Sequence, residues 1–383
     1  MKRIVVCCDG TSNKFDALNV TNVAKIARSV ASTSADGEIP QVVFYDQGVG
    51  SHGFRDTITG GAFGHGLAKN IQEAYRFIVL NYAPGDELFL FGFSRGAFTV
   101  RSLSGLITKF GVLDATEIKQ IRPTMDLYRD QEPRSTAKTH EVEIKFLGVW
   151  DTVGAMGIQA NRITGALGYW TGYTVGRAGR ALRITPKSWT PDLLRRKFAS
   201  AGRSISGRLG LNRGRYSFHD ATLSERVKNG YHAVAIDERR PIFEVVLWNK
   251  EPAPGQHIEQ VWFSGVHTEV GDGSPNVNAS AEALKWMSDR AGERGLTFTD
   301  EFEKEVSGLL GSKQKPISRS PSGPWRLAGR LRRTLGASGT GTESVHPSAI
   351  RRFCDQKFDY PAPNLETYMK SKGIDCPPPE DNQ

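Results

Sequence analysis

The pentapeptide GFSRG at residues 92–96 places one serine where it can act as a nucleophile. An unbroken apolar run, Leu88–Phe91, precedes it and is typical of a buried strand in a parallel sheet. A sharp turn from strand to helix needs small residues two positions before and after its corner, so that Ser94 projects alone from a strained backbone. The alternative is an ordinary Gly-Ser loop. We expect nucleophilic attack by Ser94, because the following residues recur at helical spacing: Ala97, Val100, Leu103, Ser104 and Ile107.

An acid that can orient a catalytic histidine follows a second apolar run. Residues 144–150 read IKFLGVW, which indicates another buried strand, and Asp151 comes directly after it. The carboxyl ends of parallel strands meet at one edge of a sheet, so we expect Asp151 to lie near Ser94. The alternative for Asp151 is a residue that caps a helix or shapes a turn.

Two histidines are candidates for the general base. His267 follows an expected strand at 260–264 and is flanked by glycines, which predicts exposure in a cleft rather than burial in a core. We expect His267 to be the base. His232 is the reserve candidate, on the approach to an expected strand at 243–248. The charged residues 237–240, DERR, favour a structural salt-bridge network over a catalytic site.

The loop after the first expected strand, at residues 3–8, supplies candidates for an oxyanion site. Gly10 lets the backbone approach a ligand closely, so the amides near Gly10 and Thr11 are expected to donate to an oxyanion together with the amide of Arg95. Asp9 is expected to fix this loop or to bind a cation. A plain Asx-turn is the equal alternative for Asp9.

An alternation of strands and helices is needed to bring these residues together. Glycines crowd residues 48–66, but their spacing fits neither a dinucleotide fingerprint nor a P-loop, so a flexible loop is expected there and an anion site is the lesser alternative. The order of the first elements predicts a mostly parallel sheet flanked by helices. These elements are a strand at 3–8, a helix at 20–32, a strand at 42–45, a helix at 67–82, the strand before Ser94 and the helix after it.

The composition of the 383-residue chain is that of an ordinary soluble protein, with 38% hydrophobic and 24% charged residues. No run approaches the length of a membrane span. The N-terminus reads as a first strand and not as a signal peptide, so synthesis in the cytoplasm is expected. The four cysteines include no C-x-x-C pair, which predicts reduced thiols and no metal site. We expect no cofactor.

The net charge of +9 indicates an acidic partner, either a phosphate-rich lipid surface or nucleic acid. Residues 155–215 join the aromatics Tyr169, Trp170 and Tyr173 to a run of arginines, which suits the interface of an anionic membrane. We interpret this insertion as a lid or surface-binding segment. A second basic run extends from Lys313 to Arg333. Solubilising insertions are the alternative for both runs.

Several motifs together resemble the serine α/β-hydrolase family that contains the first class of type VI secretion lipase effectors. The motifs are CCDGT, DQGVG, NIQEAYRFIVLNYAPGDELFLFGFSRGA, GVWDTVG, YHAVAIDERR, VWFSGVH and the late YPAPNL. Two positions near His267 depart from the family pattern, which usually has aspartate at Glu269 and glycine at Asp272. The resemblance implies an α/β-hydrolase-like fold, a triad of Ser94, Asp151 and His267, and phospholipase activity.

The expected organisation is a catalytic domain at 1–300 and a C-terminal extension at 301–383 with flexible surface segments such as GASGTGTES. The expected reaction is hydrolysis of a carboxylic ester, such as a phospholipid, through an acyl-enzyme. One alternative is an esterase for a soluble ester. The other is a nucleic-acid-binding or scaffold protein on a hydrolase fold, which is disfavoured because nucleophile, acid and base candidates are all present. Export by a signal-independent secretion system is a further expectation.

Overall fold

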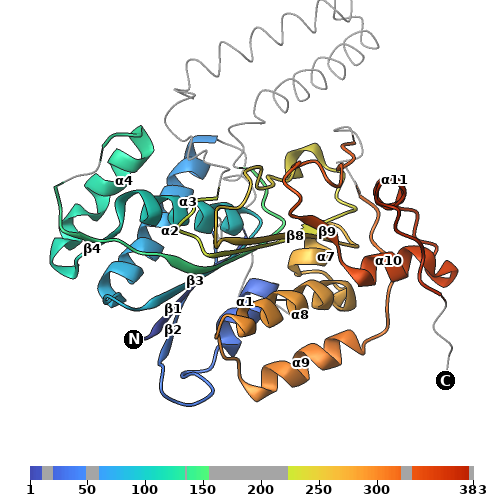
Figure 1. Cartoon of the computed structure of the whole chain (residues 1–383), viewed down its shortest axis with the longest axis horizontal. Helices are drawn as coiled ribbons and strands as arrows, with labels where there is room; N and C mark the ends of the chain where they lie inside the picture. The colour runs from blue at the N-terminus through green and yellow to red at the C-terminus, as the bar shows by residue number, and fades with distance from the viewer. Residues whose placement is uncertain (11–19, 49–59, 134–135, 155–222, 321–329, 379–383) are drawn as a thin grey trace, which may run out of the picture.

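Seven strands, all paired in parallel, form the central sheet within the part of the chain that the structure describes (Figure 1). The computed structural model describes residues 1–10, 20–48, 60–133, 136–154, 223–320 and 330–378. The strand order is β2-β1-β3-β6-β7-β8-β9. The strands are β1 (Arg3–Cys8), β2 (Gln41–Asp46), β3 (Glu87–Phe93), β6 (Ile144–Trp150), β7 (Asn229–Ala235), β8 (His257–Phe263) and β9 (Glu343–Val345).

The inner strands are apolar along nearly their whole length because both faces of the sheet are covered. Every residue of β1 is buried, and so is every residue of β3 after Glu87. Successive side chains point to opposite faces, so Val6 packs in the core on one side of the sheet and Val5 in the core on the other. Such unbroken burial is typical of parallel sheets. The predicted mostly parallel α/β framework is confirmed.

Helices cover both faces of this sheet (Figure 1). α2 and α3 share one core with β1, while α1, α8 and α9 share the core on the opposite face. The helices expected at 20–32 and 67–82 correspond to α1 and α2. The helix α2 already begins at Gly60, so the loop expected at 48–66 is wrong from that residue onward, and residues 49–59 lie outside the described ones. The helices are α1 (Asn22–Ser29), α2 (Gly60–Asn81), α3 (Arg95–Phe110), α4 (Ile121–Asp130), α7 (His267–Gly271), α8 (Val277–Glu293), α9 (Asp300–Leu310), α10 (Pro347–Cys354) and α11 (Pro363–Lys372), with short 3-10 helices η1 (Ala115–Gln120), η2 (Pro241–Phe243) and η4 (Gln356–Phe358) and a small ribbon of β4 (Val112–Leu113) and β5 (Thr139–His140).

The strand expected at 243–248 is wrong, because the sheet instead takes β7, which contains His232. Residues 243–248 have an apolar, β-branched composition, but side chains and isolated backbone contacts satisfy their polar groups. The side-chain amide of Gln260 donates to the Trp248 carbonyl and accepts from its N–H, at 2.9 and 2.8 Å. The guanidinium of Arg101 donates to the Val246 carbonyl at 2.5 Å. Because these backbone groups already have hydrogen-bond partners, the segment does not need to pair with a strand of the sheet.

The residues after α9 continue the same framework. β9 pairs with β8 at the edge of the sheet, so the flexible surface segment expected at GASGTGTES is wrong at its end, which forms this strand. The carboxylate of Glu343 accepts hydrogen bonds from the backbone N–H groups of Gly336 and Ser338, which closes the preceding turn. α10 and α11 bury apolar side chains against Val234 and Trp262 of the sheet.

A disulfide joins Cys354 at the end of α10 to Cys376 beyond α11. The expectation of reduced thiols is therefore wrong for this pair, whose wide separation in sequence hid their proximity. It holds for Cys7 and Cys8, which are free and buried in β1. Among the described helices, none is both long enough and apolar enough to cross a membrane.

Candidate active site

Ser94 lies at the corner between β3 and α3 with φ of 58° and ψ of −118°, an unusual backbone for a residue with a side chain. Its N–H donates to the carbonyl of Trp150 at 3.0 Å, which ties the corner to β6. The two flanking glycines are required by close packing. A Cβ on Gly96 would overlap the backbone at Cys8, and a Cβ on Gly92 would overlap the first turn of α3. The strand-turn-helix geometry predicted for GFSRG is present.

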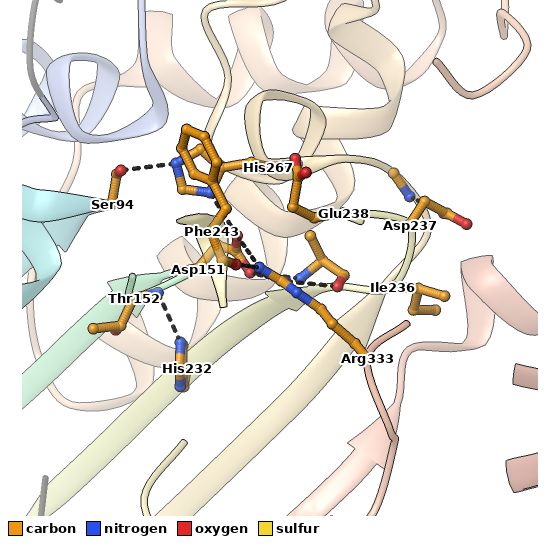
Figure 2. Close-up of polar contacts among 12 residues, drawn as sticks. Ser94, Asp151, Thr152, His232, Ile236, Asp237, Glu238, Phe243, His267 and Arg333 are labelled. Atoms are coloured by element: carbon orange, nitrogen blue, oxygen red, sulfur yellow. Dashed lines mark hydrogen bonds and ion pairs between the residues drawn. The ribbon is translucent and has the colours of Figure 1, made fainter. Parts of the chain in front are cut away.

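Figure 2 shows Ser94, His267 and Asp151 in one hydrogen-bonded chain. Nε2 of His267 lies 2.7 Å from the Ser94 hydroxyl oxygen, and its Nδ1 lies 2.5 Å from Oδ2 of Asp151. The three side chains come from the ends of three different elements of the sheet, β3, β6 and the turn after β8. All three residues are buried, with exposed fractions of 6%, 3% and 0%, so the exposure expected for His267 is wrong, because the rings of Phe93 and Phe243 pack against it. A hydroxyl, an imidazole and a carboxylate in this order can transfer a proton away from the serine.

Asp151 directly follows β6 and has a positive φ of 40°, which is uncommon for a residue other than glycine. Its N–H donates to the carbonyl of Ala233, and its Oδ1 accepts from the N–H of Ala235 at 3.0 Å. The guanidinium of Arg333 pairs with both carboxylate oxygens, at 2.5 and 3.0 Å. Burial acts to raise the pKa of Asp151, but the charge of Arg333 and the hydrogen bond from His267 hold it below its usual range.

His267 begins the short helix α7 and is held through both its backbone and its ring. Its N–H donates to Oε2 of Glu238 at 3.3 Å. Burial acts to raise the pKa of Glu238, but the ion pair with Arg240 lowers it to about 2. The imidazole centroid lies 4.7 Å from the ring centroids of both Phe93 and Phe243. The salt-bridge network predicted for the DERR residues is confirmed for Glu238 and Arg240, and it also supports the turn that carries His267.

The two residues that depart from the family pattern near His267 have structural partners. Oε2 of Glu269 accepts from the N–H of Val266, and its Oε1 accepts from the side chain of Asn276. Asp272 forms a buried ion pair with Lys25 of α1. Both carboxylates therefore stabilise the segment around α7. The His267 ring itself bonds to Ser94 and Asp151.

His232 lies inside β7 and is fully buried. Its Nε2 accepts a hydrogen bond from the N–H of Thr152 at 3.1 Å, directly after Asp151 (Figure 2). Burial, with a smaller effect from the charge of Arg101, lowers the pKa of His232 to about 3. A neutral imidazole that accepts from the backbone supports the loop of Asp151, whereas His267 occupies the position beside the Ser94 hydroxyl.

The loop after β1 is organised by Asp9, which is almost fully buried. Its carboxylate accepts from the N–H of Gly10 at 2.6 Å and from the hydroxyl groups of Thr21 and Tyr45. These donors favour the loop-fixing role that the sequence left open over the binding of a cation. The N–H of Gly10 is therefore engaged by Asp9, and Thr11 lies outside the described residues.

The amide of Arg95 is at the N-terminus of α3, next to Ser94. An N–H in the first turn of a helix has no intrahelical partner, so it is suited to stabilise negative charge beside the serine. Burial lowers the pKa of the Arg95 side chain to about 10. Within the described ranges, no group of histidine, cysteine, aspartate and glutamate side chains is arranged to hold a metal ion.

No sequence signal identified Phe243 or Arg333 as contacts of His267 and Asp151, and Glu238 was expected only as part of a salt-bridge network. Arg333 is the last residue of the second basic run, interpreted from sequence as a surface for an acidic partner or a solubilising insertion, but it is only 5% exposed. No periodic signal identified it, because its partner Asp151 is far away in the chain. The insertion at 155–215, with Tyr169, lies outside the described residues.

Comparison with known proteins gives two partial likenesses. An uncharacterized protein of Saccharomyces cerevisiae is 29% identical over 194 residues, which covers 42% of this chain and 28% of the yeast protein. The crystal structure of an uncharacterized protein from Pseudomonas aeruginosa aligns with a TM-score of 0.42 and 15% identity, over 85% of this chain and 52% of that one. The chain thus spans about a quarter of the yeast protein and about half of the Pseudomonas protein.

A family comparison covers most of the chain. Residues 2–290 match the family described as "T6SS, Phospholipase effector Tle1-like, catalytic domain", and the matched part includes Ser94, Asp151 and His267. The resemblance inferred from the sequence motifs is confirmed, and this chain belongs to the family of Tle1-like catalytic domains of type VI secretion phospholipase effectors.

Proposed function

We propose that this protein is a serine hydrolase that cleaves the carboxylic esters of phospholipids through an acyl-enzyme. The observation that carries the proposal is the chain of short hydrogen bonds from Ser94 through His267 to Asp151. Its elements follow the order serine, acid, histidine along the sequence, as in α/β-hydrolases. We propose an α/β-hydrolase-like fold on the same grounds.

The reaction begins when the Ser94 hydroxyl attacks the ester carbonyl and its proton passes to Nε2 of His267. Asp151 accepts from Nδ1–H of the imidazole, so it fixes the productive tautomer and stabilises the imidazolium. The oxyanion is stabilised by the amide of Arg95 and by a second donor from the loop after β1, for which the amide of Thr11 is the candidate because Asp9 accepts from the N–H of Gly10. The alcohol leaves with the proton from His267, and water then releases the fatty acid from Ser94 by the same steps.

The lipid substrate is supported by family membership and by the composition of residues 155–215. Arginine pairs bidentately with phosphate, and aromatic side chains such as Trp170 prefer the interface between head groups and acyl chains. We propose that this insertion acts as a lid or a membrane-binding segment. It would bring the enzyme reversibly to an anionic surface, without a resident cofactor and without nucleic acid as a partner.

Family membership also supports export of the protein by a type VI secretion system after synthesis in the cytoplasm. The disulfide between Cys354 and Cys376 agrees with action in an oxidising compartment. Detection of the protein in medium or recipient cells only when the secretion system is intact would test this part of the proposal.

The decisive experiment measures fatty acid released from anionic liposomes, zwitterionic liposomes and short soluble esters. The Ser94→Ala variant is expected to lose several orders of magnitude in rate on every substrate. His232→Gln is the matched control, because Gln can still accept from the backbone of Thr152. Cleavage of soluble esters without liposome hydrolysis would reject the phospholipase assignment alone. Full activity of Ser94→Ala would reject the serine mechanism, and salt-sensitive DNA retention by an inactive protein would favour a binding module.

A further inference from the structure

Arg333 donates four hydrogen bonds beside the catalytic carboxylate, all from its two terminal nitrogens. Its Nη1 donates to Oδ1 of Asp151 at 2.5 Å and to the carbonyl of Ala235 at 2.8 Å. Its Nη2 donates to Oδ2 of Asp151 at 3.0 Å and to the carbonyl of Phe243 at 2.6 Å. Figure 2 shows the guanidinium facing the carboxylate on the side away from Ser94. This planar, two-pronged contact holds the carboxylate in one orientation.

The backbone of Arg333 is anchored by the late motif YPAPNL, residues 360–365, which the proposed reaction does not otherwise use. The side chain of Asn364 donates to the carbonyl of Arg333 at 3.2 Å and to the carbonyl of Ile236 at 3.0 Å. The hydroxyl of Tyr360 donates to Asp237 at 2.6 Å. These bonds attach the C-terminal segment to the start of the DERR loop. Arg333 is therefore held at its backbone by Asn364 and at its guanidinium by Asp151.

The buried carboxylate needs this positive charge. Asp151 has no exposed surface, and an isolated carboxylate in such a place would take up a proton. In the proposed mechanism the general base must be neutral before it accepts the Ser94 proton, so at that stage His267 offers Asp151 a hydrogen bond but no charge. Arg333 is 5% exposed and brings a full positive charge into contact with the carboxylate.

We propose that Arg333, which lies beyond the matched residues 2–290, is a positioning residue that keeps Asp151 ionised and aimed at His267. The inference rests on the proposed serine hydrolase function and deepens it. The catalytic constellation is completed by a segment outside the family-matched domain, and Arg333 sets the pH below which Ser94 loses its reactivity.

The direction of the pH effect follows from the charges around the pair of Asp151 and His267. Arg333 faces the carboxylate, and Glu238 faces the backbone of His267, where its charge is offset by Arg240. His232 is neutral in this range and Arg101 lies behind it. Removal of Arg333 removes one positive charge, so the coupled pair takes up a proton more easily. The acid limb of the pH–rate profile, where the rate falls as the pH is lowered, must then move to higher pH.

The test measures the rate at which a fluorophosphonate probe labels Ser94 between pH 4 and 9, a range chosen to span the ordinary histidine titration. Arg333→Met is expected to slow labelling at neutral pH by roughly 10²-fold and to move the acid limb upward by about one pH unit or more. Arg333→Lys keeps the charge but not the two-pronged contact. It is expected to leave the acid limb in place and to recover part of the rate. Arg352→Met removes another buried arginine of the same segment, which donates to the Lys315 carbonyl. This variant is expected to leave both the labelling rate and the acid limb unchanged.

Thermal unfolding and circular dichroism establish that each variant is folded. If Arg333→Met does not fold, Arg333→Lys decides, and a wild-type labelling rate in that variant would overturn the positioning role. A folded Arg333→Met with an unmoved acid limb would also overturn it while leaving the serine hydrolase assignment intact. Absence of labelling in the wild-type protein would overturn the proposed function and this inference together.

Discussion

The serine end and the carboxylate end of the candidate site are built in different ways. Ser94 is positioned by its own strand and helix, β3 and α3, with glycines two residues away on each side. Asp151 depends on the backbone of β7, on His267 and on Arg333, which lie up to 182 residues away in sequence. The serine is thus carried by one strand-turn-helix unit that packs against β1 and β6, whereas the acid and base depend on side chains from several distant segments.

The largest expected effect comes from removing the charge at the centre of that assembly. Asp151→Asn retains the size of the side chain but cannot stabilise the imidazolium, and it leaves Arg333 buried without a counter-charge. We expect a loss of about 10⁴-fold in kcat for ester hydrolysis. Steady-state kinetics on a soluble ester, compared with His232→Gln, measure it. A loss below tenfold would show that the carboxylate is dispensable.

At the serine end, the corresponding test is steric. Gly96→Ala forces a methyl group into the backbone at Cys8, so we expect a loss of roughly 1–3 kcal/mol of stability together with slower labelling of Ser94. Gly308→Ala in α9 is the matched control because nothing lies near the added methyl group, and it should be neutral or slightly stabilising. Equal urea unfolding midpoints for the two variants would contradict the close packing of the turn.

Removal of the disulfide tests the C-terminal segment that carries Arg333 without changing either end of the site directly. Replacing Cys354 and Cys376 by serine releases a loop of 22 residues that contains α11, and we expect a loss of about 2–4 kcal/mol. Urea denaturation with and without reductant measures the loss. Hydrogen exchange should rise in α11 and around Arg333 before it rises in α3. Uniform exchange over both regions would show that the C-terminal segment and the serine end open as one unit.

A further effect, which is absent at neutral pH, is a pH dependence of stability that comes from His232. Its pKa is about 3 in the folded protein and about 6.5 when unfolded. The unfolded chain therefore binds the proton first, so stability is fully present above pH 6.5 and is lost as the pH falls toward 3. The slope is about 1.4 kcal/mol per pH unit, or about 2 kcal/mol by pH 5. His232→Gln should show a flatter profile in urea unfolding from pH 7 to 5, and parallel profiles would refute the assignment.

The sequence alone was enough for those features that depend on neighbours in the chain. The serine corner is recognisable because its small residues stand two positions before and after Ser94, and Asp151 and His267 are recognisable because each follows a buried apolar run. The parallel framework follows from the alternation of strands and helices. All of these signals are short-range patterns of size and hydrophobicity.

Only the tertiary structure decided which histidine meets the serine, which segment becomes a strand and where Arg333 lies. His232 and His267 each sit near a strand in the sequence, but the register of β7 places His232 behind the backbone of Thr152. Residues 243–248 look like a strand, yet their polar groups are met by side chains such as Gln260. In the sequence, nothing distinguishes Arg333 from the other basic residues. Its role depends on the buried carboxylate of Asp151, which is far away in the sequence. Charges attract according to their distance in space, so an ion pair of this kind produces no recognisable pattern in the sequence.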